Sequence, residues 1–211
     1  MQASLKQSIR LTHNLGVKMN KVYYANKDIR SWVHAIIRSM NDQNWRPDYI
    51  VGLTRGGLVP AVMLSQYLNI PMHTLNVSLR DGDLGPESNL WMAEEAFGYI
   101  NKEDRQDAEF EITHLPVAGD ASDPKGRKNI LIVDDINDSG ATLNWICDDW
   151  MSGCLPNDDS WNDVWHHNVR FAVLVNNEAS RFGTVDYVGT SINKLETPCW
   201  VVFPWEDWWN E

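Results

Sequence analysis

Cysteine is scarce in this chain, with three residues in 211. Cys147, Cys154 and Cys199 form no Cys-x-x-Cys pair and no zinc-ligand spacing. The pattern argues against a disulfide framework and against a structural zinc site. It suits a reducing compartment, and we expect a cytoplasmic protein.

Long apolar runs are also missing. No run approaches the roughly 18 residues that a membrane-spanning helix needs. The first twenty residues lack the continuous apolar segment of a secretory signal. We therefore expect neither a membrane span nor a membrane partner.

Positive charge is sparse in the C-terminal part of the chain. The formal net charge is −11, and residues 130–211 contain 3 Lys and Arg against 14 Asp and Glu. Nonspecific binding to nucleic acid relies on a basic surface, so we expect no nucleic-acid partner. A small polyanion would need a metal ion or a few well-placed cations to bind.

Tryptophan, in contrast, is abundant, with 11 residues in the chain. Four of them lie at the C-terminus: Trp200, Trp205, Trp208 and Trp209. Packing of the tail, a subunit interface and contact with a ligand are all open roles for these side chains.

Apolar strands alternate with helices along the chain. Strands are expected over 48–54, 72–79, 129–134, 171–175 and 185–189, and helices over 26–40, 57–68, 91–100 and 141–151. The alternation predicts an α/β fold with a parallel, doubly wound central sheet covered on both faces. Ligands of such sheets bind where loops leave the carboxyl ends of the strands. Two unusual loops, 54–57 and 134–142, leave strands at that edge.

The second loop, in ILIVDDINDSGATL (130–143), contains three aspartates within five residues. An EF-hand calcium site is excluded, because the position that must supply a bidentate carboxylate is Ile146. An acidic turn in which Asp138 or Ser139 caps the next helix remains an alternative. That alternative does not explain why Asp134 and Asp135 end a buried strand, where carboxylates are costly without partners.

A sugar-phosphate site explains the loop better. A helix N-terminus with hydroxyl side chains binds a phosphate dianion, and a glycine lets the backbone approach closely. The residues of this kind are Ser139, Gly140, Ala141 and Thr142. Asp134 and Asp135 can accept hydrogen bonds from two ribose hydroxyls, directly or through a metal.

Three segments resemble the type I phosphoribosyltransferases. IVDDINDSGAT is similar to their motif for phosphoribosyl pyrophosphate (PRPP). Residues 51–71 resemble the pyrophosphate loop and following helix of the xanthine-guanine and hypoxanthine enzymes, and TPCWVVFPWE (197–206) resembles their purine-binding segment. The resemblance covers roughly residues 21–209. It implies one domain over 19–211 and a dispensable N-terminal extension over 1–18.

The resemblance also implies a small hood over the site. The hood would consist of the polar excursion 80–129, which includes a flexible loop that excludes water, and the base-binding C-terminal segment 190–211. Family members commonly form homo-oligomers, so we expect a dimer or tetramer.

Roles for individual residues follow from the matched motifs. Asp134 and Asp135 correspond to the ribose and metal-site acids, with Glu206 as a further ligand of Mg²⁺. Asp138 corresponds to the general base and, with residues 139–142, to the 5′-phosphate loop. The pyrophosphate loop, in which the family often has a non-proline cis peptide, corresponds to Thr54, Arg55, Gly56 and Gly57.

The base-binding residues match less well. Trp200 corresponds to the aromatic that stacks on the base, and the backbone of Val201 and Val202 to the groups that read its edge. The family usually has a lysine after the strand 171–175, but Asn176 stands there. An asparagine both donates and accepts hydrogen bonds, which leaves the identity of the base open.

The resemblance therefore implies a Mg²⁺-dependent transferase of purine salvage. It would join hypoxanthine, guanine or xanthine to PRPP and release a nucleoside monophosphate and pyrophosphate. Two alternatives stay open: a pyrimidine or unusual base as acceptor, and a regulatory protein of this fold that senses PRPP or nucleotides.

Overall fold

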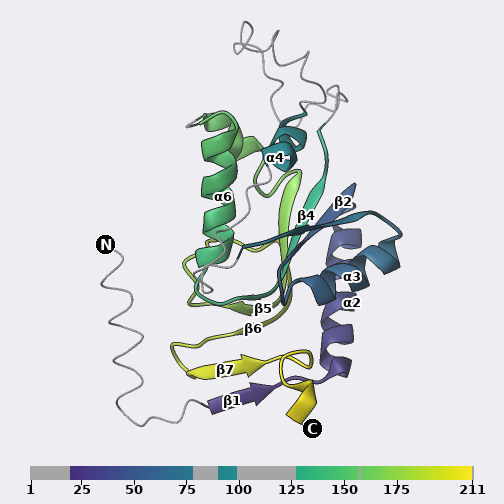
Figure 1. Ribbon diagram of the computed structural model, residues 1–211, viewed down its shortest axis with the longest axis vertical. Coiled ribbons are helices and arrows are strands. Elements are labelled where there is room, and N and C mark those ends of the chain that lie inside the picture. Colours follow the sequence, from purple (N-terminus) through teal and green to yellow (C-terminus); the bar gives the residue numbers. More distant parts are fainter. Residues whose placement is uncertain (1–19, 78–89, 99–126, 157, 211) are drawn as a thin grey trace, which may run out of the picture.

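The computed structural model describes residues 20–77, 90–98, 127–156 and 158–210 (Figure 1). Its centre is a five-stranded, all-parallel sheet in the order β3-β2-β4-β5-β6. The predicted α/β fold with a parallel central sheet is confirmed. No helix in the described ranges is both long and apolar enough to cross a membrane.

The elements lie close to their predicted positions. The strands of the sheet are β2 (Tyr49–Leu53), β3 (Met72–Leu75), β4 (Ile130–Asn137), β5 (Val169–Asn177) and β6 (Tyr187–Ile192). The helices are α2 (Asn26–Asp42), α3 (Leu58–Leu68), α4 (Leu90–Phe97) and α6 (Ala141–Gly153), with short 3₁₀ turns η2 (Asp159–Asp163) and η3 (Trp208–Asn210). Strand β4 extends beyond its predicted end at residue 134, so Asp135 as well as Asp134 lies inside the strand and not in the loop after it.

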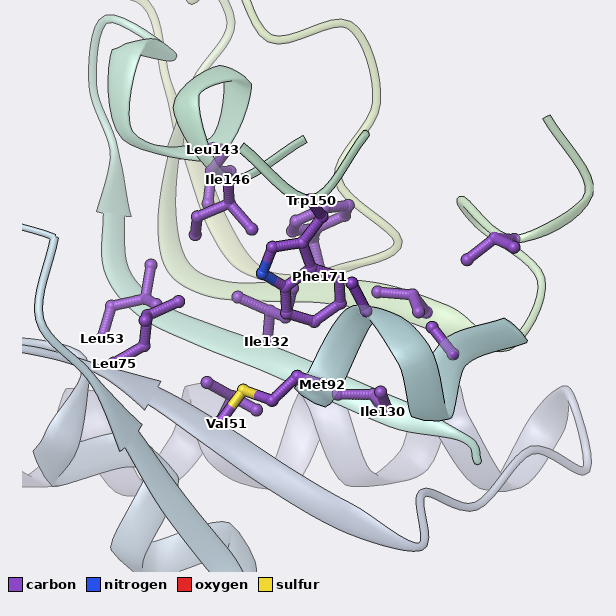
Figure 2. Packing of buried hydrophobic residues seen from close by; sticks show 14 of the residues in the cluster. Val51, Leu53, Leu75, Met92, Ile130, Ile132, Leu143, Ile146, Trp150 and Phe171 are labelled. Carbon is purple, nitrogen blue, oxygen red and sulfur yellow. The ribbon is translucent and has the colours of Figure 1, made fainter. Parts of the chain in front are cut away.

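Both faces of the sheet are covered, because successive side chains of a strand point to opposite sides. Ile50 of β2 and Leu131 of β4 pack with α2 and α3. Their neighbours Val51 and Ile132 pack on the other face with α4 and α6 (Figure 2). The sheet is therefore doubly wound, as predicted.

Helix α2 starts at Asn26, where the predicted helix also starts. The residue at the N-cap is Ala25, and the Asp28 carboxylate accepts a hydrogen bond of 2.8 Å from the Ala25 backbone N–H. Asp28 thus stabilises the first turn from inside the helix, and Asn26 is simply its first residue.

A second, two-stranded sheet was not predicted. Strands β1 (Asn20–Tyr23) and β7 (Cys199–Val202) pair in parallel, with Val22 opposite Val201 (Figure 1). The pairing attaches the C-terminal segment to the N-terminal end of the domain. Of the predicted 80–129 part of the hood, only 90–98 and 127–129 belong to the described residues, so most of that excursion lies outside them, whereas the C-terminal part of the hood is described up to residue 210.

Candidate active site

The direction of winding reverses between β2 and β4. These strands are neighbours in the sheet, yet α3, which follows β2, and α6, which follows β4, pack on opposite faces. Loops that separate in this way leave a crevice at the carboxyl ends of the two strands, the usual ligand site of open α/β sheets. The loops predicted to bind the ligand are the two that leave this point.

The loop after β2 lies directly against β4. A Cβ atom placed on Gly56 would lie 1.7 Å from Oδ2 of Asp135. A Cβ on Gly57 would lie 2.4 Å from the carbonyl oxygen of Val133 and 2.8 Å from Cα of Asp134. The loop can approach β4 this closely only because neither Gly56 nor Gly57 has a side chain. The close contact with the end of β4 therefore requires glycine at both positions.

The Thr54–Arg55 peptide in the same loop is cis, as the resemblance implied. Thr54 receives support from β3: its N–H donates to the Leu75 carbonyl at 3.0 Å, and its hydroxyl donates to Oδ1 of Asn76 at 3.0 Å. Asn76 was not among the predicted residues. Arg55 is exposed at the edge of the loop.

Two carboxylates from distant segments lie near each other. Burial raises the pKa of Asp135 to about 6, and the charge of the Glu206 carboxylate contributes to the rise. Glu206 is held in place by a 2.9 Å hydrogen bond that its Oε2 accepts from the Phe203 N–H. The structure thus brings together Asp135 and Glu206, which are predicted ligands of one metal ion.

The N-cap residue of α6 supplies no capping side chain. The N-cap is Gly140, with φ of 83° and no side chain to accept a hydrogen bond. The backbone N of Phe182 would lie 2.4 Å from a Cβ at this position, so only glycine fits. Ser139 Oγ accepts a 3.3 Å bond from the Ala141 N–H, which satisfies one donor. Neither Asp138 nor Ser139 is the N-cap.

Asp138 instead forms an ion pair. Its Oδ1 lies 2.9 Å from Nζ of Lys194, just after β6. Sequence reasoning missed this lysine, although it follows a predicted apolar strand at the same carboxyl edge. Asn177 connects the two loops, because its amide donates to the Asp138 carbonyl at 2.8 Å and accepts from the Lys194 N–H at 3.0 Å.

Asn176, the predicted contact to the base, belongs to a network at the ends of β4 and β5. Its Oδ1 accepts a 2.9 Å bond from the side-chain amide of Asn137, which is 2% exposed. The Ser180 hydroxyl donates to Oδ1 of Asn137 at 2.8 Å. The network connects the end of β5 to the end of β4, so its first role is to hold the two strand ends together.

The predicted base-binding residues of β7 differ in exposure. Trp200 is 42% exposed, whereas Val201 and Val202 are buried. The carbonyl of Val202 accepts a 3.1 Å bond from the Tyr24 N–H. The backbone of β7 is therefore partly used in pairing with the N-terminal segment, while the indole of Trp200 faces outward.

The family model of the phosphoribosyl transferase domain matches residues 19–207, nearly the whole described fold. The chain belongs to this phosphoribosyltransferase family. The match confirms the resemblance that the three motifs indicated, and with it the enzyme class, a transferase.

Proteins similar to this phosphoribosyltransferase include purine enzymes. It is 22% identical to xanthine phosphoribosyltransferase 1 of Saccharomyces cerevisiae, over 88% of this chain and 90% of that one. It is 28% identical to the xanthine-guanine phosphoribosyltransferase of Cereibacter sphaeroides, over 77% and 70% of the two chains. A solved Helicobacter pylori xanthine-guanine-hypoxanthine phosphoribosyltransferase shares the fold, with a TM-score of 0.56, 16% identity, and coverage of 90% and 97%.

Proposed function

We propose that this phosphoribosyltransferase transfers the 5-phosphoribosyl group of PRPP to a purine base. The products are a nucleoside monophosphate and pyrophosphate, as in purine salvage. The observation that carries the proposal is the contact between Gly56 and Asp135, which joins the loop after β2 to the acidic end of β4 at the switch point of the sheet. Hypoxanthine, guanine and xanthine are the preferred acceptors, because the similar curated enzymes are named for these bases.

PRPP binds across the two loops in this proposal. The backbone N–H groups at the start of α6 and the hydroxyls of Ser139 and Thr142 bind the 5′-phosphate. The binding loop comprises Asp138, Ser139, Gly140, Ala141 and Thr142. Asp134 and Asp135 accept hydrogen bonds from the ribose hydroxyls. The pyrophosphate lies against the loop Thr54, Arg55, Gly56 and Gly57, where Arg55 supplies a positive charge.

Mg²⁺ is the proposed cofactor, and the matched motifs make Asp134, Asp135 and Glu206 its candidate ligands. In the described part of the chain, no group of three or more His, Cys, Asp or Glu side chains is arranged to hold a metal alone. Mg²⁺ usually binds one or two carboxylates plus substrate phosphates, so the pair Asp135 and Glu206 fits a metal that arrives with PRPP. Bound there, the ion offsets the charge of the pyrophosphate and helps it leave.

The carboxylates of β4 stabilise the positive charge that develops on the ribose as the pyrophosphate departs. Asp138 accepts the proton that the attacking purine loses, a step typically worth about 10²–10⁴-fold in rate. Trp200 stacks on the base, and the backbone of Val201 and Val202 reads its edge, with Asn176 beside it. The proposed partners of the chain are thus two small molecules, PRPP and the purine base.

The test incubates protein, PRPP and Mg²⁺ separately with hypoxanthine, guanine, xanthine, adenine and uracil and follows pyrophosphate release. Release with a 6-oxopurine and formation of its monophosphate are expected. Release with uracil alone would favour a pyrimidine acceptor. If no base gives release, the catalytic proposal is wrong and a PRPP-sensing protein takes its place.

Two further predictions remain independent of this reaction. A dimer or tetramer is expected from the family and can be tested by light scattering of the purified protein. The cytoplasmic location is tested by fractionation of the source cells.

A further inference from the structure

We propose that the side chain of Phe203 positions the Glu206 carboxylate in the candidate metal site. Phe203 belongs to a row of packed aromatic rings that begins on α2 and ends one residue before Glu206. This aromatic row consists of Trp32, Tyr24, Phe203 and Trp205. The inference rests on the proposed function, because it assigns a positioning role to residues beside the same site.

Glu206 is exposed, so its own packing does not fix its side chain. A glutamate has several rotatable bonds, and holding it in one rotamer costs conformational entropy. After burial, the charge of Glu206 is nevertheless the main cause of the raised pKa of Asp135, so the two carboxylates lie close together. Contacts other than burial of Glu206 must therefore keep its carboxylate near Asp135.

A tight turn ties the carboxylate to the backbone of Phe203. The Glu206 N–H donates to the Phe203 carbonyl at 3.0 Å, and Oε2 of Glu206 accepts from the Phe203 N–H at 2.9 Å. Pro204 occupies the second position of this turn, which suits the fixed φ of proline. The position of the Glu206 carboxylate therefore follows the position of Phe203.

The ring of Phe203 has two aromatic neighbours. Phe203 is 2% exposed, and its ring stacks on that of Trp205, with centroids 4.9 Å apart and planes 4° apart. The Tyr24 ring lies 6.3 Å from the Phe203 ring, within the usual range for packed aromatic pairs. The Tyr24 N–H also donates to the carbonyl of Val202 at 3.1 Å. Phe203 is thus held by its ring as well as by the neighbouring backbone.

The indole of Trp205 contributes its ring and not its N–H. Its Nε1 is buried and has no hydrogen-bond partner in the described part of the chain. A buried tryptophan usually finds such a partner, and leaving a buried donor unpaired costs stability. Contact between the two ring faces is therefore what holds Trp205 beside Phe203.

The aromatic row is anchored on the central sheet through α2. Trp32 packs edge-on against Tyr24, with ring centroids 4.7 Å apart. A Cβ atom placed on Gly189 of β6 would lie 2.4 Å from Cβ of Trp32, so α2 lies directly on the sheet at this point. The C-terminal segment passes close to the start of α2 (Figure 1). The aromatic row therefore connects the position of Glu206 to the sheet that carries Asp135.

The test separates the ring of Phe203 from its backbone. Phe203→Leu preserves the N–H and an apolar side chain but removes the stack. At the half-buried position of Tyr24, Tyr24→Leu removes a ring of the row and Tyr24→Phe keeps it. Phe171→Leu is the matched control, because Phe171 is a buried aromatic of β5 that packs on Trp165, outside the proposed site.

For each protein, the dissociation constant of Mn²⁺ is measured by electron paramagnetic resonance at saturating PRPP without a base. The Mg²⁺ concentration for half-maximal pyrophosphate release and the KM for the accepted base are measured as well. The thermal midpoint of each variant checks its fold. If Phe203→Leu does not fold, the comparison of Tyr24→Leu with Tyr24→Phe decides alone.

In Phe203→Leu, Mn²⁺ binding is expected to weaken about tenfold, the lower end of the usual loss when a group that holds a metal ligand is removed. Tyr24→Leu changes it in the same direction and less, whereas Tyr24→Phe and Phe171→Leu keep the wild-type value. The Mg²⁺ requirement rises in parallel, while the KM for the base stays within about twofold of that of the wild type, because the Phe203 ring acts on the metal site.

Unchanged Mn²⁺ binding in folded Phe203→Leu overturns the inference, because the backbone hydrogen bond would then suffice. Equal weakening in Phe171→Leu, or a rise in base KM as large as that in the Mg²⁺ requirement, also overturns it; in each case the proposed function stands. Wild-type protein that binds Mn²⁺ with PRPP but transfers to no base, and loses this binding in Phe203→Leu, overturns only the proposed function. Wild-type protein that binds no Mn²⁺ with PRPP overturns the inference.

Discussion

Gly56 lies against Asp135 with no room for a side chain, since a Cβ on the glycine would meet Oδ2 of the carboxylate at 1.7 Å. The contact joins the loop after β2 to the end of β4 across the switch point of the sheet. The position of the Asp135 carboxylate, which is proposed to bind PRPP, therefore depends on the absence of a side chain at Gly56.

Gly56→Ala is expected to displace the Asp135 carboxylate, because the obstructing atoms belong to that side chain and not to the backbone. The KM for PRPP should rise at least about tenfold, since precise placement of binding groups dominates such sites. Steady-state kinetics at saturating base measures the change. Gly183→Ala is the control, because a Cβ at Gly183 meets nothing within 4 Å. Equal KM values in the two variants would contradict the proposed role of the contact.

Gly57→Ala is expected to act on stability instead. The added Cβ would meet backbone atoms of Val133 and Asp134 at 2.4 and 2.8 Å, and these cannot turn aside as a side chain can. Overpacking of this kind costs about 1–3 kcal/mol. Urea unfolding should show a larger loss in Gly57→Ala than in Gly56→Ala. The reverse order would show that β4 shifts more easily than the Asp135 side chain.

Asp138→Ala tests the proposed general base. The rate constant kcat should fall by about 10²–10⁴-fold, the usual worth of such a proton transfer. The loss of stability should be limited to that of the partly exposed ion pair with Lys194, because the N-cap of α6 is Gly140 and not Asp138. Asp159→Ala, which removes an exposed aspartate of η2, is the matched control. A variant that keeps its kcat would leave Asp138 with a structural role through Lys194 only.

The acidic pair predicts a pH dependence of stability in metal-free protein. Burial and the charge of Glu206 raise the pKa of Asp135 to about 6. Between pH 4 and 6 the folded protein keeps a proton that the unfolded chain has released, so the free energy of unfolding falls as pH rises. Asp135→Asn removes this loss and should gain on the order of 1–2 kcal/mol over the wild type between pH 4 and 7.

Urea unfolding in EDTA across this pH range measures the difference. Glu206→Gln removes the second cause of the raised pKa and should give a smaller gain than Asp135→Asn. Parallel curves for the wild type and Asp135→Asn would contradict the assignment of the pH dependence to this carboxylate.

The N-terminal extension is expected to be dispensable for transfer. The family match begins at residue 19, and the resemblance begins close to it. A chain begun at Met19 should keep the kcat and KM of the full chain within about twofold, since the proposed site residues all lie after Met19. Loss of activity in a truncated but folded chain would show that residues 1–18 contribute to the site.

The sequence determined the frame of this protein. Continuous apolar strands between helices predicted the parallel sheet, because a strand that is buried on both faces needs apolar side chains at nearly every position. The acidic run before Ser139 and Gly140 indicated a ligand loop, because its carboxylates are costly without partners. Each of these signals depends on residues that are close together in the chain, so it can be recognised in the sequence without knowledge of the fold.

Contacts between distant segments were decided by the tertiary structure alone. The pairing of Val22 with Val201 and the approach of Glu206 to Asp135 join residues with no periodic relation in the chain. Lys194 reaches Asp138 only because β6 follows β5 in the sheet and ends at the same edge as β4. A sequence specifies which strands end in polar residues, but the order of strands in the sheet decides which of those residues meet.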